Sequence, residues 1–176
     1  GIAVDSNGKI YFSDIGNSCI RKIDANGIIN TIAGIPGSSG YSGDNGPATQ
    51  AQLYLPKGIA VDDIGNLYIA DKYNNCVRKV DANGIITTIA GGNGAGYSGD
   101  GGFAINAQIY QPEGIAIDHI GNIYTTEATA YGPHVIRRID TSGIITTFAG
   151  TSSRGFSGDG GPATEAQLFN PRDVAV

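Results

Sequence analysis

Short hydrophobic runs separated by polar turns recur along the whole chain. The run "GIAVD" begins at Gly1 and Gly58 and returns as "GIAID" at Gly114, and each run is followed by a turn that contains Gly. Asp at the start of such a turn bonds the local backbone and Gly accepts a positive φ angle, as a tight hairpin requires. The next runs, "KIYFSD", "NLYIAD" and "NIYTTE", are rich in β-branched and aromatic residues. The pattern predicts pairs of antiparallel strands.

Two further strands follow in each unit. The segments "CIRKID", "CVRKVD" and "VIRRID" alternate apolar and basic residues with period two, which predicts half-buried strands. The turns "ANG" or "TSG" then lead into "IINTIAG", "IITTIAG" or "IITTFAG". Each unit is therefore predicted to be four short antiparallel strands, and the unit repeats about every 57 residues, as the separation of Cys19 and Cys76 shows.

A long connection returns the chain to the next unit. It contains "YSGDNGPATQAQL" (41–53), "YSGDGGFAINAQI" (97–109) and "FSGDGGPATEAQL" (156–168). Proline after glycine predicts the first turn of a short helix, with the nearby Asp bonding free N–H groups. Ala48 and Ala51 are three apart and predict a small-residue face for close packing. We interpret the segment as a strap between units.

Four-stranded sheets repeated at this length are typical of β-propeller blades. An immunoglobulin-like tandem needs about seven strands and a hundred residues per domain, and so fits poorly. The predicted fold is all-β, with three four-stranded antiparallel blades and a short helix in each connecting loop. The predicted divisions are blade repeats 1–57, 58–113 and 114–172, and the first strand of a further blade at 173–176.

The pattern "GIAVD…GNLYIAD…VRKVD…ITTIAG" resembles the NHL-repeat family of β-propellers. The motif "GYSGDGGPAT.AQL" is similar to that of a long-loop bacterial variety. This resemblance covers essentially the whole chain. It implies a propeller, more often than not of six blades, that acts as a binding platform for protein, nucleic acid or carbohydrate. It also implies an exported protein, extracellular or periplasmic.

Three blades are too few for a ring, because propellers close with about four to eight. The chain is therefore expected to be a piece of a longer propeller, or to be completed to six blades by dimerisation through its open edges. The final segment "RDVAV" repeats the strand "GIAV" of the amino end. One of the two is redundant in a head-to-tail ring, which favours a fragment of a longer chain.

Composition narrows the functional classes. Hydrophobic residues make up 40% of the chain and charged residues 15%, with a net charge of −5. The acidic balance argues against nucleic-acid binding, and no apolar run is long enough for a membrane span. The chain contains no methionine and shows no signal segment, so it is expected to be a mature form, a fragment or an engineered piece. Cys19 and Cys76 occupy equivalent positions and are expected to be unpaired thiols.

The repeated "SGD" motif raises the question of a calcium or phosphate site. Its acidic residues are Asp44, Asp100 and Asp159. Calcium needs six to eight oxygen ligands, and a phosphate loop needs a lysine or a longer glycine cradle. The motif supplies neither, so a structural role is predicted and no metal or cofactor is expected.

A second repeated set combines acids at the end of the second strand with arginines on the third. Its members are Asp14, Asp71, Glu127, Arg21, Arg78 and Arg137. Their joint recurrence predicts bidentate pairing within each blade. A pair that every unit repeats is more simply a stabilising device than a catalytic site.

The third unit departs from the pattern in the loop "EATAYGPHV", which is three residues longer than its counterpart. Tyr131 and His134 are particular to this copy, and exposed side chains there are candidate ligand contacts. The alternative is a neutral insertion at a tolerant hairpin. The other histidine, His119, is expected at the surface of a turn.

The function that these features favour is a non-catalytic binding or interaction scaffold, with a protein or a glycan as partner. Two alternatives stay open. One is a propeller lyase or hydrolase whose central site needs further blades. The other is a structural module that assembles into rings or fibres through its open edges.

Overall fold

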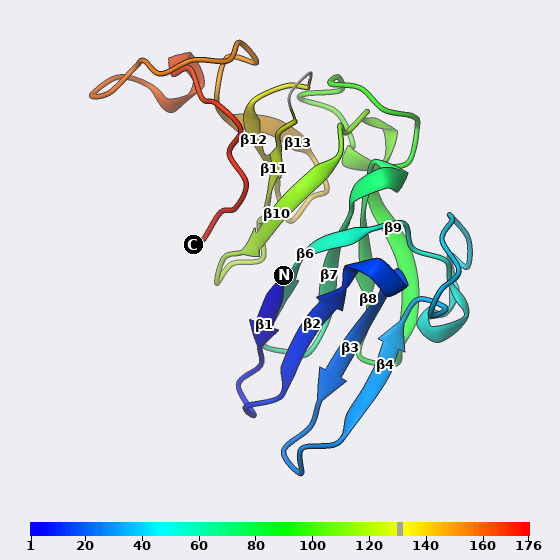
Figure 1. Cartoon of the computed structure of the whole chain (residues 1–176). Coiled ribbons are helices and arrows are strands. Elements are labelled where there is room, and N and C mark those ends of the chain that lie inside the picture. The colour runs from blue at the N-terminus through cyan, green and yellow to red at the C-terminus, as the bar shows by residue number, and fades with distance from the viewer. Residues whose placement is uncertain (130–131) are drawn as a thin grey trace.

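The computed structural model describes residues 1–129 and 132–176, and its strands form three antiparallel sheets (Figure 1). Blade 1 contains β1 (Ile2–Val4), β2 (Ile10–Asp14), β3 (Cys19–Ile23) and β4 (Ile29–Ala33). Blade 2 contains β6 (Pro56–Val61), β7 (Leu67–Asp71), β8 (Cys76–Val80) and β9 (Ile85–Gly91). Blade 3 contains β10 (Pro112–Ile117), β11 (Ile123–Glu127), β12 (Val135–Ile139) and β13 (Ile145–Ala149). The predicted all-β propeller blades are confirmed.

The hairpin turns form because one aspartate organises each of them. Asp62 Oδ1 accepts the N–H groups of Ile64 and Asn66 at 3.2 and 2.8 Å, and its Oδ2 accepts the Tyr68 hydroxyl at 3.1 Å. Gly65 follows with a φ of +88°. Asp5 and Asp118 bond the equivalent groups in the other two blades. These contacts fix the turn and tie it to the second strand of the same blade.

The straps, defined as residues 41–53, 97–109 and 156–168, each contain one 3₁₀ turn of three residues. Those turns are η2 (Ala48–Gln50), η4 (Ala104–Asn106) and η5 (Ala163–Glu165), and blades 1 and 2 add η1 (Ile15–Asn17) and η3 (Lys72–Asn74). Pro47 precedes η2 with φ −59° and ψ 127°, so it is extended rather than in the first helical turn. No side chain caps η2. The predicted capping role of Asp44 is therefore wrong, and its actual partner is described below.

The first strap belongs structurally to the blade that follows it. Its short strand β5 (Gly46–Pro47) pairs antiparallel with β9 and adds a fifth strand to blade 2. Ala48 and Ala51 are fully buried, as their spacing predicted. The two ends of the first strap can lie close together because Gly43 lacks a side chain. A Cβ there would lie 2.6 Å from the Ala51 Cα.

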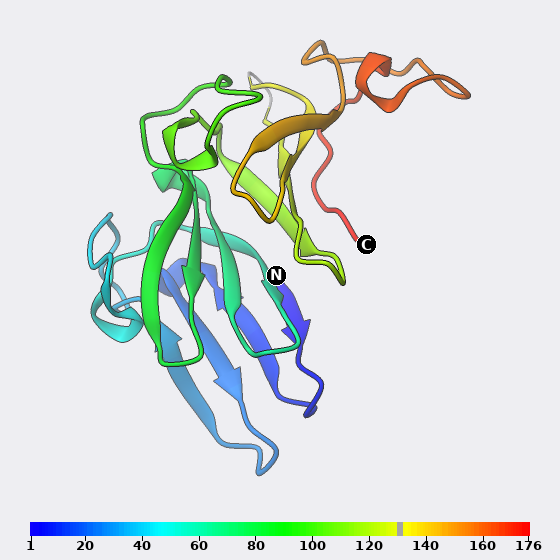
Figure 2. The ribbon, with the colours of Figure 1, turned by 180° about the vertical axis from the view of Figure 1, so that it is seen from behind.

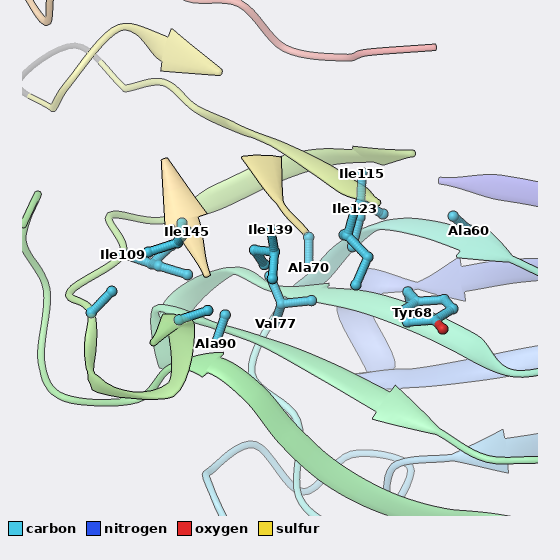
Figure 3. Packing of buried hydrophobic residues seen from close by; sticks show 12 residues of the cluster. Ala60, Tyr68, Ala70, Val77, Ala90, Ile109, Ile115, Ile123, Ile139 and Ile145 are labelled. Atoms are coloured by element: carbon cyan, nitrogen blue, oxygen red, sulfur yellow. The ribbon is translucent and has the colours of Figure 1, made fainter. Parts of the chain in front are cut away.

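The hydrophobic core lies between blades rather than inside them. Figure 3 shows the cluster between blades 2 and 3, where Val77 and Ala70 of one sheet face Ile139 and Ile123 of the next. A second cluster joins blades 1 and 2 through residues such as Ile20 and Ile69. Because each blade buries one face against a neighbour, the blades stabilise one another in series.

Each outer strand ends in, or is followed by, a glycine that lies just beyond a bulge and that no other residue could replace without strain. The register between β8 and β9 shifts between Val77 and Arg78. Gly91 comes after this bulge with a φ of +74°, and a Cβ there would lie 2.4 Å from the Asn75 carbonyl oxygen. Gly34 and Gly150 have the same contact in the other blades, at 2.5 and 2.4 Å. The glycine of each "TIAG" or "TFAG" is thus required by both backbone conformation and space.

The innermost strands of the blades approach one another along their backbones. A Cβ on Gly58 would lie 2.4 Å from the Glu113 carbonyl oxygen, and one on Gly114 would lie 2.6 Å from the Asp173 Cα. The final segment, 171–176, therefore lies beside β10 where the innermost strand of a following blade would lie. Figure 2 shows this segment and the third strap extending from blade 3, while β1 and β4 border the opposite end of the arc.

Two further sequence predictions concern the thiols and the membrane. Cys19 and Cys76 are free and buried. Among residues 1–129 and 132–176, no helix has the length and apolar character of a membrane span.

Candidate functional site

The charged residues singled out in the sequence meet at the junction between a strap and the next blade. Arg78 on β8 donates from Nη2 to Asp44 Oδ1 at 2.7 Å, and Asp44 lies in the first strap. The same guanidinium donates to the Ser42 carbonyl at 3.1 Å and to the Gln52 carbonyl at 3.4 Å. Asp71 of the same blade is 3.6 Å from Arg78 Nη1. We call this group of strap aspartate, strand arginine and strand acid the strap clasp.

The same clasp joins the second strap to blade 3. Arg137 Nη2 lies 2.5 Å from Asp100 Oδ1, and its Nη1 lies 3.5 Å from Glu127 Oε1. The Thr147 N–H donates to the second oxygen of Asp100 at 2.9 Å. The guanidinium of Arg137 also lies 5.2 Å from the ring centre of Tyr97, in cation–π contact. Each clasp thus binds one strap aspartate to a buried arginine of the following blade.

The predicted ion pair between the arginine and the acid of the same blade is present, but it is not bidentate. In blades 2 and 3 it is longer than the contact between that arginine and the strap aspartate. In blade 1, Arg21 Nη1 is 3.8 Å from Asp14 Oδ2, and both side chains are partly exposed. Arg78 and Arg137 are fully buried. The difference follows from the strap, because no strap residue contacts Arg21 within the described part of the chain.

Burial changes the proton affinity of the clasp acids. Desolvation raises the pKa of Glu127 from 4.5 to about 7, although Arg137 and the Tyr110 N–H act in the opposite direction. Desolvation likewise raises the pKa of Asp71 from 3.8 to about 6. We therefore expect the stability of the contacts between strap and blade to depend on pH.

We expect Glu127→Gln to reduce the dependence of stability on pH. Because the folded pKa lies above the unfolded one, the stabilisation is full below pH 4.5 and is lost as pH rises through about 7. The loss from this group is at most about 3 kcal/mol. The free energy of unfolding, measured by urea denaturation at several pH values in that range, should change less with pH in the variant than in the wild type. Glu165→Gln removes a carboxylate from an exposed strap position and is the control. Equal slopes for wild type and Glu127→Gln would contradict the interpretation.

His134 occupies a structural position rather than an exposed one. Its side chain is 3% exposed, and its Nδ1 accepts the Asn170 N–H at 3.3 Å. Asn75, the equivalent residue of blade 2, accepts the Gln111 N–H at 3.0 Å in the same way. Burial, with a contribution from Arg154, lowers the pKa of His134. The expectation of an exposed histidine is therefore wrong, and Tyr131 lies outside the described residues.

A polar hollow lies where the innermost strands converge. Its volume is about 510 Å³, and Lys57, Glu113 and Arg172 take equivalent positions around it. Glu113 contacts Lys57 and accepts a hydrogen bond from Lys72 at 2.6 Å. Burial alone would raise the pKa of Glu113, but the two lysines outweigh it and lower that pKa. Two lysines thus share the single carboxylate of Glu113, while Arg172 and Asp173 also line the hollow. Within the described residues, no three His, Cys, Asp or Glu side chains are grouped as metal ligands.

The hairpin tips form a second hollow, of about 420 Å³, between blades 2 and 3. Ile64 and Ile120 project at equivalent places in the two turns and are 77% and 62% exposed. Blade 1 has Asn7 at this position. His119 is exposed beside them, as predicted. Sequence reasoning missed this site, although an isoleucine inside an "Asp-x-x-Gly" turn was a visible signal.

The comparisons with known proteins agree with the repeat structure. The family Teneurin NHL domain matches residues 33–98 and 94–157. Teneurin-1 of Gallus gallus is 34% identical over 197 residues, which covers 100% of this chain and 7% of that protein. Teneurin-4 of Homo sapiens is 32% identical, with the same two coverages. The chain thus spans about 7% of the length of the curated relatives it matches.

Solved structures share the fold. A structural genomics protein of unknown function from Bacteroides thetaiotaomicron has a TM-score of 0.75 at 19% identity, over 99% of this chain and 41% of that one. A streptogramin B lyase has a TM-score of 0.57 at 16% identity, over 84% and 39%. At these identities the likeness extends to the fold alone.

The predicted NHL propeller is confirmed by these matches, whereas the bacterial long-loop variety stays a prediction. The family match covers more than half of the chain and includes the strap clasps of both internal junctions. The chain therefore belongs to the Teneurin NHL domain family.

Proposed function

We propose that this chain is a non-catalytic protein-binding module of a larger protein that is exposed outside the cell. Family membership supports a module within a long protein, since the relatives are many times longer than the chain. The free thiols are compatible with an oxidising environment because both are buried. Burial also raises the pKa of Cys76 well above its ordinary value, which lowers its reactivity.

The observation that carries the proposal is the apolar character of the hairpin tips. Asp62 and Asp118 already supply the bonds that each turn needs. The turn therefore does not need Ile64 or Ile120, and Gly, Pro, Asn, Asp and Ser are the residues that turns ordinarily favour. Two isoleucines at one hollow form a small apolar anchor site of the kind that protein partners use.

The chemistry around the hollow indicates the kind of segment that would bind. Asp63 is exposed beside Ile64, and the chain carries a net charge of −5. An acidic rim around an apolar centre favours a partner segment with an apolar side chain next to lysine or arginine. We therefore infer a basic, apolar peptide segment of another protein as the partner, in preference to a glycan.

A peptide library displayed on phage and selected against the chain tests this proposal. We expect enriched peptides to combine an apolar anchor with basic residues. We also expect Ile64→Asn/Ile120→Asn to weaken their binding about tenfold or more, because each buried isoleucine contributes roughly 1.5–3 kcal/mol. This variant copies the asparagine that blade 1 already carries, so folding should be unaffected.

Two results would contradict the proposal. One is selected peptides that bind the double variant as tightly as the wild type, measured by calorimetry. The other is specific binding on a glycan array together with a peptide selection that enriches nothing.

A further inference from the structure

The second strap forms an outer edge of blade 3, as the first strap does for blade 2. The Ala104 N–H donates to the Gly143 carbonyl at 2.8 Å, and the Ile145 N–H donates to the Gly102 carbonyl at 3.0 Å. Phe103 lies between these two bonds and pairs antiparallel with the edge of the blade. The backbone groups of a residue in such a position point away from the neighbouring strand. The N–H group of Phe103 therefore faces outward from blade 3.

The first strap has a proline at this position. Pro47 is the residue equivalent to Phe103, and it pairs with β9. Proline offers no N–H group and is one of the residues that block the exposed edges of sheets. Pro162 takes the same place in the third strap. Among the three straps, the second alone therefore presents a backbone donor at this position.

The fold does not need the N–H group of Phe103. Within the described part of the chain, this group makes no hydrogen bond. The φ and ψ angles of Phe103 are −64° and 129°, close to the −59° and 127° of Pro47. The backbone would therefore accept proline at position 103 without strain.

The same strap is apolar where the first strap is not. Phe103 and Ile105 are 59% and 44% exposed, and their equivalents in the first strap are Pro47 and Thr49. Those two equivalents are also exposed, so the position lies at the surface in both straps that join two complete blades. Because most of its ring is exposed, Phe103 contributes little to the core.

The chemistry of this edge selects an extended and uncharged segment. An outward N–H group on a sheet edge binds the carbonyl oxygen of an added strand, and nearby side chains select the residues of that strand. The polar residues that border the edge, Asn106 and Ser142, are exposed and uncharged. Asp100, the acid of this strap, already binds Arg137. A charged residue of a partner would lose hydration at this edge without gaining a counter-charge.

We propose that the second strap is a docking edge for an extended, uncharged apolar segment of another protein. A backbone carbonyl of that segment accepts the Phe103 N–H, and an apolar side chain of the segment packs on Phe103 and Ile105. This edge shares no residue with the hollow at the hairpin tips. The inference is therefore independent of the function proposed above.

A peptide library displayed on phage tests the edge, if it is first depleted on Phe103→Pro and then selected on the wild type. We expect enriched peptides to be apolar and uncharged. By calorimetry, Phe103→Pro should weaken their binding at least about thirtyfold, and Phe103→Ala and Ile105→Thr about tenfold each. The control Ile64→Asn/Ile120→Asn should bind them as the wild type does. Phe103→Pro should unfold at the same temperature as the wild type or higher, because proline restricts the unfolded chain.

Hydrogen exchange measured by NMR on the wild type tests the backbone bond without any variant. The amide hydrogen of Phe103 should exchange rapidly in the free protein and at least about tenfold more slowly with a selected peptide bound. Unchanged exchange at Phe103 in the complex would overturn the proposal. So would a selection that enriches no peptide with a preference for the wild type over Phe103→Pro.

Discussion

Replacing Arg137 with alanine is expected to lower the free energy of unfolding by about 3–5 kcal/mol, the cost of breaking a buried ion pair by removing one partner. Arg137 is fully buried and holds Asp100 and Glu127 together with the carbonyl oxygens of Ser98 and Gln108. Its loss leaves Glu127 buried without a counter-charge and removes the bonds from Arg137 to the second strap, although backbone bonds such as that from the Ala104 N–H to the Gly143 carbonyl remain. Urea denaturation followed by circular dichroism measures the effect.

Blade 1 offers the matched control. Arg21 has the same place in its sheet, but it is partly exposed and contacts Asp14 at 3.8 Å. Its replacement by alanine should cost less than about 1 kcal/mol, as for an ordinary surface pair. The cost of Arg137→Ala should also shrink toward pH 5, where the raised pKa of Glu127 lets the unpaired acid take up a proton. Equal losses for the two arginines would refute the importance of the clasp.

Gly91→Ala is expected to destabilise the protein by about 2–4 kcal/mol. The residue has a φ of +74°, and the added methyl group would lie 2.4 Å from the Asn75 carbonyl oxygen. The conformational strain accounts for about 1 kcal/mol, and the forced shift of a packed backbone for about 1–3 kcal/mol. The backbone cannot relax easily, because the added methyl group would also lie 3.1 Å from the Cys76 Cα and 3.2 Å from the Ile109 Cβ of the second strap.

Gly84→Ala separates the two causes. Gly84 has a similar φ, +80°, but an added methyl group there meets nothing within 4 Å. This control should therefore lose only about 1 kcal/mol from backbone strain. If thermal unfolding shows equal shifts for the two variants, close packing at the bulge is not what requires glycine.

The strands and hairpins could be predicted because their causes are local. Asp62 organises a turn four residues long, and the alternation in "CVRKVD" assigns each side chain to a face of its strand. The repetition of these signals three times identified the propeller, and the structure confirms it. The small-residue face of Ala48 and Ala51 was also predictable, because both lie within one turn of chain.

The partners of the charged residues could not be predicted from one repeat. Asp44 lies 34 residues from Arg78, its partner in the next blade. Sequence spacing favoured Asp71, which lies on the adjacent strand of the same blade and is in fact the more distant partner. The role of His134 could not be predicted either, because its backbone partner also lies far along the chain. The histidine is chemically unlike Asn75, yet its ring nitrogen accepts the same backbone N–H group.

The placement of the clasp has a consequence for how such genes change. The second repeat carries an arginine, Arg78, that receives the strap before it and an aspartate, Asp100, that reaches the blade after it. A duplicated repeat therefore arrives with both halves of a fitting junction, and a deleted repeat leaves two halves that still fit. Adding or removing a whole repeat therefore needs no compensating substitution of the clasp residues at the new junction.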